Sequence, residues 1–245
     1  METTWTIPTP DGHTIYGVKN SSGLTTSKAI FIVHGLTGHM NEYAFKRAAD
    51  YFEETYDVYR FNLYDGRDGG RNMVDCTIKT HAGDLNLVLE HFAKSYKQVF
   101  LIGHSYGGPT VMTANPSNIT AVSLWDPSFD LRHTQERFED AYTPCGDMYM
   151  VNWGTTYLIG KAMYEEAGRL DESACIELSK KFLSPIQVIS AGDGFFAKSP
   201  LSWNSYACKH SIREFVHGTA HCFYEGNSCN DLLKKTQDWF NTSCL

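Results

Sequence analysis

The sequence has little of what a nucleic-acid-binding or membrane-spanning protein requires. Its 245 residues hold 21 Lys and Arg against 28 Asp and Glu, a formal charge of −7, and the basic residues form no cluster. Because phosphate binding rests on clustered positive charge, we expect no nucleic acid partner. The longest apolar runs, such as residues 29–33 and 99–102, are far shorter than the roughly 20 residues of a membrane helix. We therefore expect no stable membrane insertion.

Paired cysteines and a secretory leader are also missing. The seven cysteines form an odd set without a CxxC pair, which favours reduced structural thiols over a disulfide framework. The first residues, METTW, lack the basic flank and the apolar stretch of a signal peptide. His217 and His221 are four residues apart, but Gly218 and the absence of a following Glu argue against a helical zinc pair. These features predict a cytoplasmic protein that uses no metal and no cofactor.

The composition is that of one well-packed domain. Hydrophobic residues make up 42% of the chain and aromatic residues 13%, with no internal repeat and no low-complexity tract. Such a chain buries enough apolar surface to offset the entropy of ordering, so disorder, collagen and coiled coil are excluded.

Short apolar runs of strand length recur along the chain, and several are apolar at every position. That pattern is typical of strands buried on both faces of a parallel sheet. Apolar residues at helical spacing lie between them or after them, in segments 42–56, 85–92 and 232–240. The alternation predicts an α/β fold with a mostly parallel central sheet flanked by helices, and residues 5–15 predict an antiparallel hairpin at its edge. The expected strands are residues 29–33, 58–61, 99–102, 121–125, 186–190 and 212–216.

One connection is much longer than a crossover helix. Residues 127–184 separate two expected strands and are rich in aromatic residues and methionine. Connections of this length usually carry function or structure of their own. We expect residues 1–126 and 185–245 to form the core and residues 127–184 a small cap. Its aromatic side chains either pack the cap onto the core or line an apolar substrate pocket, for which Trp153 and Tyr157 are candidates.

The strongest motif is GHSYG at residues 103–107, directly after an expected apolar strand and before an expected helix. This is the G-x-S-x-G nucleophile elbow in its required context. The turn between strand and helix is so tight that only small residues fit two positions before and two positions after the serine. Ser105 then lies at the N-terminus of the following helix, where backbone N–H groups and the helix dipole favour negative charge. A dinucleotide-binding turn is the alternative, but Ser105 replaces the middle glycine that lets the backbone approach a pyrophosphate.

A nucleophilic serine needs a histidine base and a carboxylate, which follow it in the chain in this fold. His221 lies after the last expected strand. Asp193 follows the strand before it, and Asp126 follows the strand at residues 121–125. We prefer Asp193 as the acid because the turn after the penultimate strand lies beside the histidine loop. Asp126 is the alternative.

Acyl transfer also needs two donors for the oxyanion. One is expected from the N–H of Tyr106, and the other from the N–H of Leu36 in the glycine-containing loop at residues 34–39. In the same loop, Thr37 and His39 are candidate substrate contacts, although a supporting role is equally open. His34 and His104 are expected to be buried hydrogen-bonding supports.

These motifs resemble the α/β-hydrolase superfamily, and within it the branch of monoacylglycerol lipases, cinnamoyl and other carboxylesterases, and serine aminopeptidases. The resemblance rests on segments 34–38, 103–107, 190–193 and 218–223 and covers nearly the whole chain. It implies the triad Ser105, Asp193 and His221 and a cap inserted after the sixth strand. The segment YDGRDGGR at residues 64–71 departs from the Asp-x-x-Gly-x-Gly-x-Ser pattern of that branch.

The expected reaction is hydrolysis of a carboxylic ester through an acyl-enzyme, with a small-molecule ester carrying a small to medium apolar or aromatic acyl group as substrate. Alternatives on the same triad are a serine aminopeptidase or amidase and a thioesterase. A non-catalytic receptor for an apolar small molecule is an alternative of another class.

Overall fold

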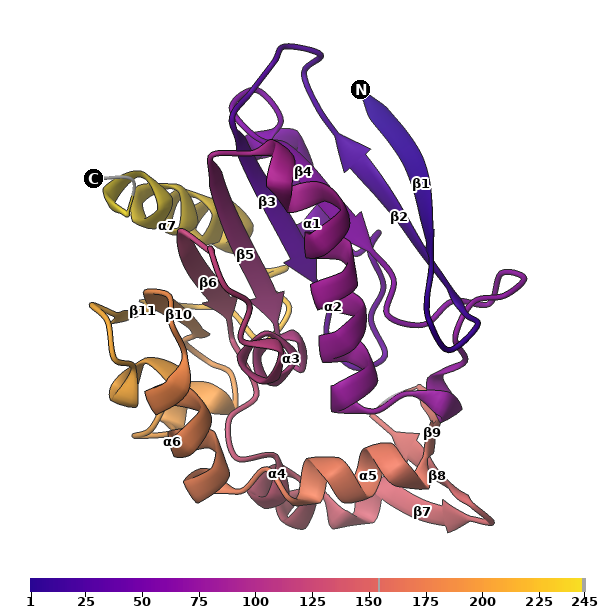
Figure 1. Ribbon diagram of the computed structural model, residues 1–245. Helices are drawn as coiled ribbons and strands as arrows, with labels where there is room; N and C mark the ends of the chain where they lie inside the picture. Colours follow the sequence, from indigo (N-terminus) through magenta and orange to yellow (C-terminus); the bar gives the residue numbers. More distant parts are fainter. Residues whose placement is uncertain (154, 244–245) are drawn as a thin grey trace.

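The computed structural model describes residues 1–153 and 155–243, and eight of its strands form one central sheet. The strand order in this sheet is β1-β2-β4-β3-β5-β6-β10-β11 (Figure 1). The strands β4, β3, β5, β6, β10 and β11 run parallel to one another. The β1–β2 hairpin and the β2–β4 pair are antiparallel. The expected α/β fold with a mostly parallel sheet is confirmed. The strands are β1 (Glu2–Pro8), β2 (Thr14–Asn20), β3 (Lys28–Val33), β4 (Asp57–Phe61), β5 (Gln98–His104), β6 (Ala121–Trp125), β10 (Ile186–Ala191) and β11 (Ile212–Val216).

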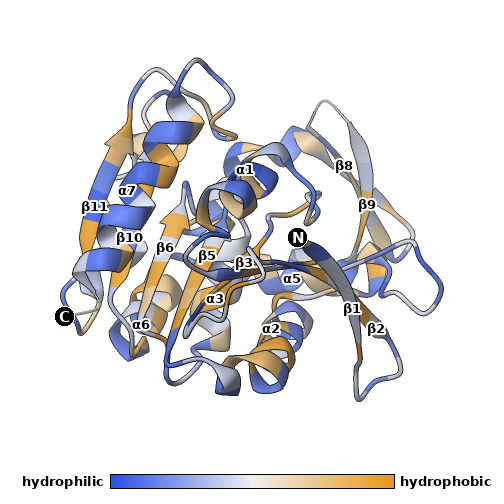
Figure 2. Ribbon diagram, turned by 90° about the horizontal axis from the view of Figure 1, so that it is seen from above, coloured by the Kyte–Doolittle hydropathy of each residue, from blue (hydrophilic) through white to orange (hydrophobic). Residues whose placement is uncertain are grey.

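Helices cover both faces of the sheet, as the view from above shows (Figure 2). One face carries α1 (Tyr43–Phe52) and α7 (Ser228–Thr242), and the other carries α2 (Ile78–Phe92), α3 (Gly107–Ala114) and α6 (Glu172–Lys181). Each helix turns an apolar side to the sheet, so the central strands are buried on both faces. This explains why their sequences are continuously apolar rather than alternating.

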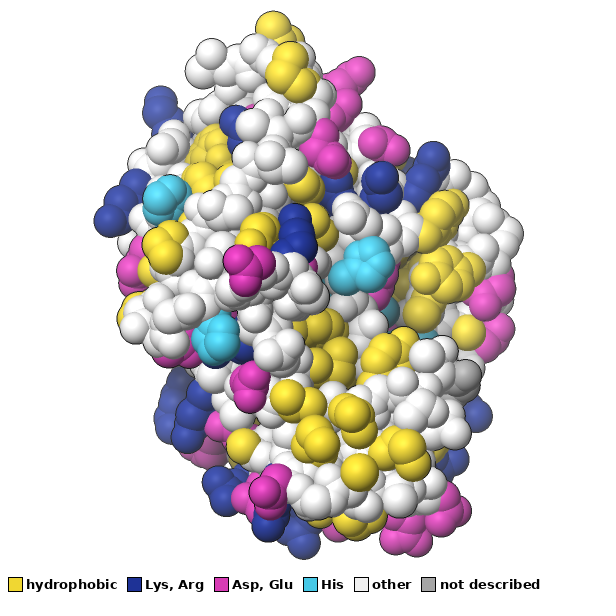
Figure 3. All heavy atoms as spheres, turned by 90° about the vertical axis from the view of Figure 1, so that its right-hand side faces the viewer, with side chains coloured by type: hydrophobic (Ala, Val, Ile, Leu, Met, Phe, Trp, Pro, Cys, Tyr) yellow, Lys and Arg dark blue, Asp and Glu magenta, His cyan; other side chains and the backbone are white. Residues whose placement is uncertain are grey.

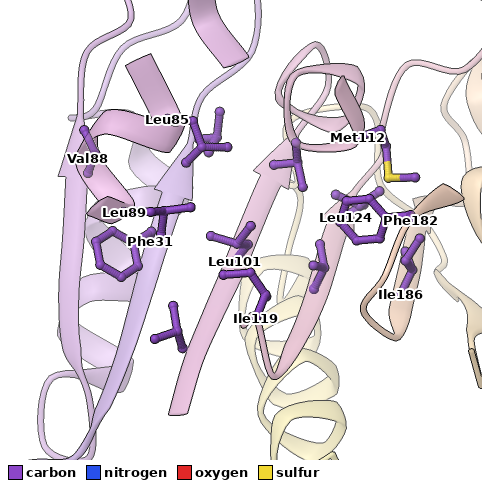
Figure 4. Close-up of a cluster of buried hydrophobic side chains, with 14 of the residues drawn as sticks. Phe31, Leu85, Val88, Leu89, Leu101, Met112, Ile119, Leu124, Phe182 and Ile186 are labelled. Atoms are coloured by element: carbon purple, nitrogen blue, oxygen red, sulfur yellow. The ribbon is translucent and has the colours of Figure 1, made fainter. Parts of the chain in front are cut away.

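Two apolar cores result, one on each face of the sheet. On the α2/α3 side, side chains of β3 and β5 such as Phe31 and Leu101 pack against Leu85 and Leu89 of α2 (Figure 4). On the other side, Phe45 and Phe52 of α1 pack with residues of α7 against the sheet. The carboxyl ends of the parallel strands therefore stand at one edge of a rigid layer, where ligand sites of α/β proteins form.

The chain between β6 and β10 builds structure of its own. It contains α4 (Leu131–Arg137), the antiparallel strands β7 (Tyr142–Cys145), β8 (Met148–Asn152) and β9 (Thr156–Gly160), and α5 (Lys161–Gly168). These elements share an apolar cluster that includes Val151, Ile159 and Met163. The last helix of the expected cap, α6, instead places Cys175 in the core beside the sheet, so it belongs with the core layer.

Short 3₁₀ turns complete the chain. They are η1 (Met73–Asp75), η2 (Ala93–Ser95), η3 (Glu139–Ala141), η4 (Phe196–Lys198) and η5 (Trp203–Tyr206). Within residues 1–153 and 155–243, the helices all fall short of the length and hydrophobicity that a bilayer crossing needs. The six cysteines of this described part are unpaired, and Cys244 lies outside the described residues.

Gly107 provides a test of how closely α3 packs on the sheet. A Cβ at Gly107 would collide with the carbonyl oxygen of Val33, the last residue of β3. It would also come within 3.1 Å of the carbonyl oxygen of His34, the next residue. Because that backbone is fixed in the sheet, Gly107→Ala should lower the free energy of unfolding by about 1–3 kcal/mol. Gly83→Ala is the matched control. Its Cβ would meet nothing within 4 Å, so gained helix propensity should stabilise the protein by up to about 1 kcal/mol. Equal urea midpoints for the two variants would contradict this packing.

Candidate active site

Ser105 occupies the sharp turn between β5 and α3. Its φ is 54°, in the left-handed region that non-glycine residues rarely adopt. Hydrogen bonds hold this backbone on both sides: the Ser105 N–H donates to Trp125 O at 3.0 Å, and Ser105 O accepts from the N–H groups of Gly108 and Ser128 at 2.9 and 3.0 Å. A Cβ at Gly103 would come 2.9 Å from Gly107 O, which explains the small residues around the serine. The turn has the backbone geometry of a nucleophile elbow.

Ser105 and His221 line the same cavity, of about 290 Å³. Leu36 and Tyr106, the two expected sources of oxyanion donors, line it as well. The cavity thus brings together residues from the β3, β5 and β11 ends of the sheet, which are separated by up to 185 positions in the sequence.

The carboxylate that contacts the imidazole is Asp126. His221 Nδ1 lies 2.6 Å from Asp126 Oδ2, so in the neutral ring Nδ1–H donates and Nε2 keeps its lone pair. The other oxygen, Oδ1, accepts from the Ala191 N–H at 3.1 Å. The Asp126 side chain is fully buried, whereas that of His221 is 37% exposed. A buried carboxylate with both oxygens bonded fixes the tautomer and orientation of the imidazole.

This geometry corrects the prediction that Asp193 is the acid. The side chain of Asp193 is exposed, and the hydrogen bond of this residue to the histidine loop comes from its main chain, with Asp193 N–H donating to Thr219 O at 3.0 Å. The Asp193 side chain lines a second cavity, together with Arg137 and Lys198. The premise about strand order was right, because β10 does lie beside β11; the error lay in assuming that proximity of a turn implies proximity of its side chain.

One signal in the sequence could have identified Asp126. It follows five apolar or small residues of β6, all buried, so its carboxylate enters the interior and needs partners there. Asp193 lies between two glycines in an exposed turn, where a carboxylate is solvated. A buried acid at the end of a central strand is the better candidate.

His104 supports the loop that carries His221. Its Nε2 lies 3.0 Å from the His221 carbonyl oxygen, and the two rings lie 4.8 Å apart. Burial lowers the pKa of His104 to about 3, so the ring is neutral and Nε2–H donates. The expectation of a buried support is confirmed.

Of the four residues expected to contact the substrate, one lines the cavity and three do not. Trp153 lines the cavity that Ser105 and His221 share. Thr37, His39 and Tyr157 are not among the described residues that line it. Thr37 has a φ of 65° within the loop after β3, and the His39 N–H donates to Glu42 Oε1 at 3.2 Å, so both residues shape that loop.

The cavity wall comes mainly from residues 131–167, hereafter called the cap, and sequence patterns alone did not identify most of the lining residues. None of the described residues that line the cavity is Asp, Glu, Lys or Arg. Apolar side chains also gather on the outer surface of the cap, in the lower part of Figure 3. The apolar lining residues include Leu131, Phe138, Ile159, Met163, Ala167 and Phe196.

Comparisons with known proteins agree with this architecture. The family model for serine aminopeptidase, S33, matches residues 25–169. Est1E from Butyrivibrio proteoclasticus is 16% identical, with a TM-score of 0.78 and 98% of each chain covered; it has also been solved with ferulic acid bound. Mouse alpha/beta hydrolase domain-containing protein 10 is 15% identical, with a TM-score of 0.76 and coverage of 98% of this chain and 99% of the other. No curated protein sequence matches the chain.

Fold and family model together define an α/β-hydrolase of the serine hydrolase class. Because the model spans more than half of the chain, the protein belongs to the family described as serine aminopeptidase, S33. The resemblance drawn from the motifs is confirmed.

The two aspartates provide a direct test of the acid. Asp126→Asn keeps the shape but cannot hold the imidazole in the required tautomer, so kcat on an activated ester should fall by about 10³–10⁴-fold. Asp193→Asn changes a side chain outside the catalytic cavity and should stay within about threefold of wild type. The reverse pattern in steady-state kinetics would restore Asp193 as the acid.

Buried histidines make stability sensitive to mild acid. Burial lowers the pKa of His34 to about 4 and that of His81 to about 3. Neither ring nitrogen of His81 has a hydrogen-bond partner among the described residues. As the pH falls from about 6.5 towards 4, these histidines become protonated in the unfolded chain but stay neutral in the native protein. The free energy of unfolding therefore decreases.

Each such histidine contributes up to about 1.4 kcal/mol per pH unit to this loss. His81→Phe should therefore reduce the slope of unfolding free energy between pH 6 and 4.5 by about that amount, as measured by urea titrations at several pH values. An unchanged slope would show that His81 is protonated in the native protein.

Proposed function

We propose that the protein is a serine-dependent carboxylic ester hydrolase. Ser105 attacks the ester carbonyl while Nε2 of His221 takes the hydroxyl proton. Asp126 holds the imidazole through Nδ1 and stabilises its cationic form. The N–H groups of Leu36 and Tyr106 donate to the oxyanion. The alcohol leaves with the proton from His221, and the same imidazole then activates a water molecule against the acyl-enzyme.

The 2.6 Å contact between His221 and Asp126, at a cavity shared with Ser105, carries this proposal. It leaves Nε2 as the acceptor on the ring. A serine hydroxyl is a weak nucleophile alone and needs such an acceptor. The proposal requires no metal and no cofactor, because the three side chains and two main-chain amides supply every proton transfer and charge interaction.

The cavity supports a small to medium apolar or aromatic acyl group. Its walls are apolar and aromatic, and about 290 Å³ is at the small end of ligand pockets. Est1E, which shares the fold at 16% identity, has been solved with ferulic acid, an aromatic carboxylic acid. Aromatic rings of the cap, including Phe138 and Trp153, offer stacking partners for such an acyl group.

Peptide hydrolysis is the second candidate, because the matching family model is described as a serine aminopeptidase. An aminopeptidase binds a free, positively charged amino terminus, which requires a carboxylate or several carbonyl groups near the scissile bond. The described lining residues include no Asp or Glu. A desolvated ammonium group in this cavity would have no carboxylate partner among the described lining residues, which favours a neutral ester.

Replacement of Ser105 tests the proposal. Ser105→Ala should lower kcat on a p-nitrophenyl ester by about 10⁵–10⁶-fold and abolish labelling by a fluorophosphonate, with little change in unfolding free energy. Ser128→Ala, which removes another hydroxyl from the cavity lining, is the matched control and should remain labelled. Unreduced ester hydrolysis by Ser105→Ala would refute the assignment.

The same assay separates the candidates when an aryl-acyl ester is compared with an aminoacyl amide. A higher kcat/KM on the ester is expected. A clear preference for the amide would favour the aminopeptidase, and an unlabelled Ser105 in the wild type would favour a non-catalytic receptor.

A further inference from the structure

The peptide unit between Gly35 and Leu36 lies against the nucleophile. A Cβ at Gly35 would come 2.9 Å from Ser105 Cβ and 3.4 Å from Ser105 Oγ. In a trans peptide the C=O and the N–H point in opposite directions. Whatever fixes the direction of the Gly35 carbonyl therefore also fixes the direction of the Leu36 N–H, the expected oxyanion donor.

Three donors converge on that carbonyl. His34 Nδ1 lies 2.8 Å from Gly35 O, the Gly38 N–H donates to it at 3.2 Å, and the Tyr64 hydroxyl lies 3.3 Å away. The single Tyr64 O–H proton is shared with Gly38 O, which lies closer at 2.8 Å, so one phenol bridges both ends of the turn at residues 35–38. A carbonyl held from three sides has little freedom to rotate about its peptide plane.

The tautomer of His34 is fixed by its other ring nitrogen. The Leu63 N–H donates to His34 Nε2 at 3.0 Å, and a main-chain amide can only donate. Nε2 is therefore unprotonated, the proton is on Nδ1, and Nδ1–H donates to Gly35 O. Burial lowers the pKa of His34 to about 4, which keeps the ring neutral at physiological pH.

Tyr64 comes from the segment at residues 64–71 that departs from the pattern of the resembling branch. Burial raises the pKa of its hydroxyl, so the phenol stays protonated and able to donate. Its ring packs edge-on against the ring of His34, with centroids 5.0 Å apart. The next residue, Asp65, is anchored by Arg67 and by Asn62, which holds Tyr64 in place.

We propose that His34 and Tyr64 are positioning residues that hold the Gly35 carbonyl and thereby aim the Leu36 N–H at the oxyanion. The inference rests on the proposed ester hydrolysis and adds two residues that do not touch the substrate. Preorganised donors stabilise a transition state because they need no reorientation as charge develops. Loss of the clamp should therefore lower kcat rather than substrate binding.

Two substitutions of His34 separate positioning from packing. The amide nitrogen of Asn takes the place of Nδ1, so His34→Asn keeps a donor to Gly35 O. The longer His34→Gln places its amide near Nε2, so it keeps an acceptor for Leu63 but loses the donor. We expect kcat within about tenfold of wild type for His34→Asn and about 10²-fold lower for His34→Gln, with KM within threefold for both.

Tyr64→Phe removes only the hydroxyl and is a second variant should a His34 substitution fail to fold. Its kcat should fall by about tenfold at unchanged KM. A trifluoromethyl ketone, which forms a tetrahedral adduct with the serine, should lose affinity in proportion to kcat/KM across the variants. Circular dichroism and urea unfolding establish that each variant is folded.

The inference would be overturned by equal kcat for His34→Asn and His34→Gln in folded protein, or by a loss that appears in KM alone. Either result, with Ser105→Ala still inactive, would leave the ester hydrolase assignment intact. Full activity of Ser105→Ala would instead refute the assignment and the clamp together.

Discussion

The buried carboxylate of Asp126 is the point on which the arrangement of the site depends. It lies at the end of a central strand and bonds both the imidazole of His221 and the main chain at the end of β10. A carboxylate removed from water is stable only when its oxygens are satisfied, so the acid and the two loops require one another. The same bonds that keep the charge in the interior hold the histidine loop beside the elbow.

Neutral histidines provide the second layer of support around this centre. His34 and His104 each give a main-chain carbonyl a directed N–H donor, one in the loop after β3 and one in the loop after β11. Both rings are uncharged because they are buried. The protein thus stabilises the loops after β3 and β11 without adding further charge. The cost is lower stability in acid, where the unfolded chain binds protons that the buried rings do not.

Much of the fold was predictable from the sequence. Strands buried on both faces appear as continuous apolar runs, and the tight turn of the elbow requires the small residues Gly103 and Gly107. The choice between Asp126 and Asp193 had only one weaker signal, the apolar strand directly before Asp126, because both acids follow strands that end at the same edge. Which carboxylate turns inward depends on backbone direction: Asp126 has a φ of 40°, and no local pattern announces this. The cavity wall was predictable only as a region, since its side chains come from irregular packing of the cap.

Phe195 and Phe196 stand between the catalytic cavity and the second cavity, and both line each of them. They belong to the turn after β10, which also carries Asp193 and which, with the acid supplied by β6, has no part in the proposed proton transfer. Substitution of Phe195 can therefore reshape this wall and with it the choice of ligand, whereas the ring of Phe196 also lies against the His221 ring, with centroids 5.7 Å apart. Two neighbouring residues of one turn thus differ in how far they can vary: the first borders the ligand, and the second is also constrained by the imidazole.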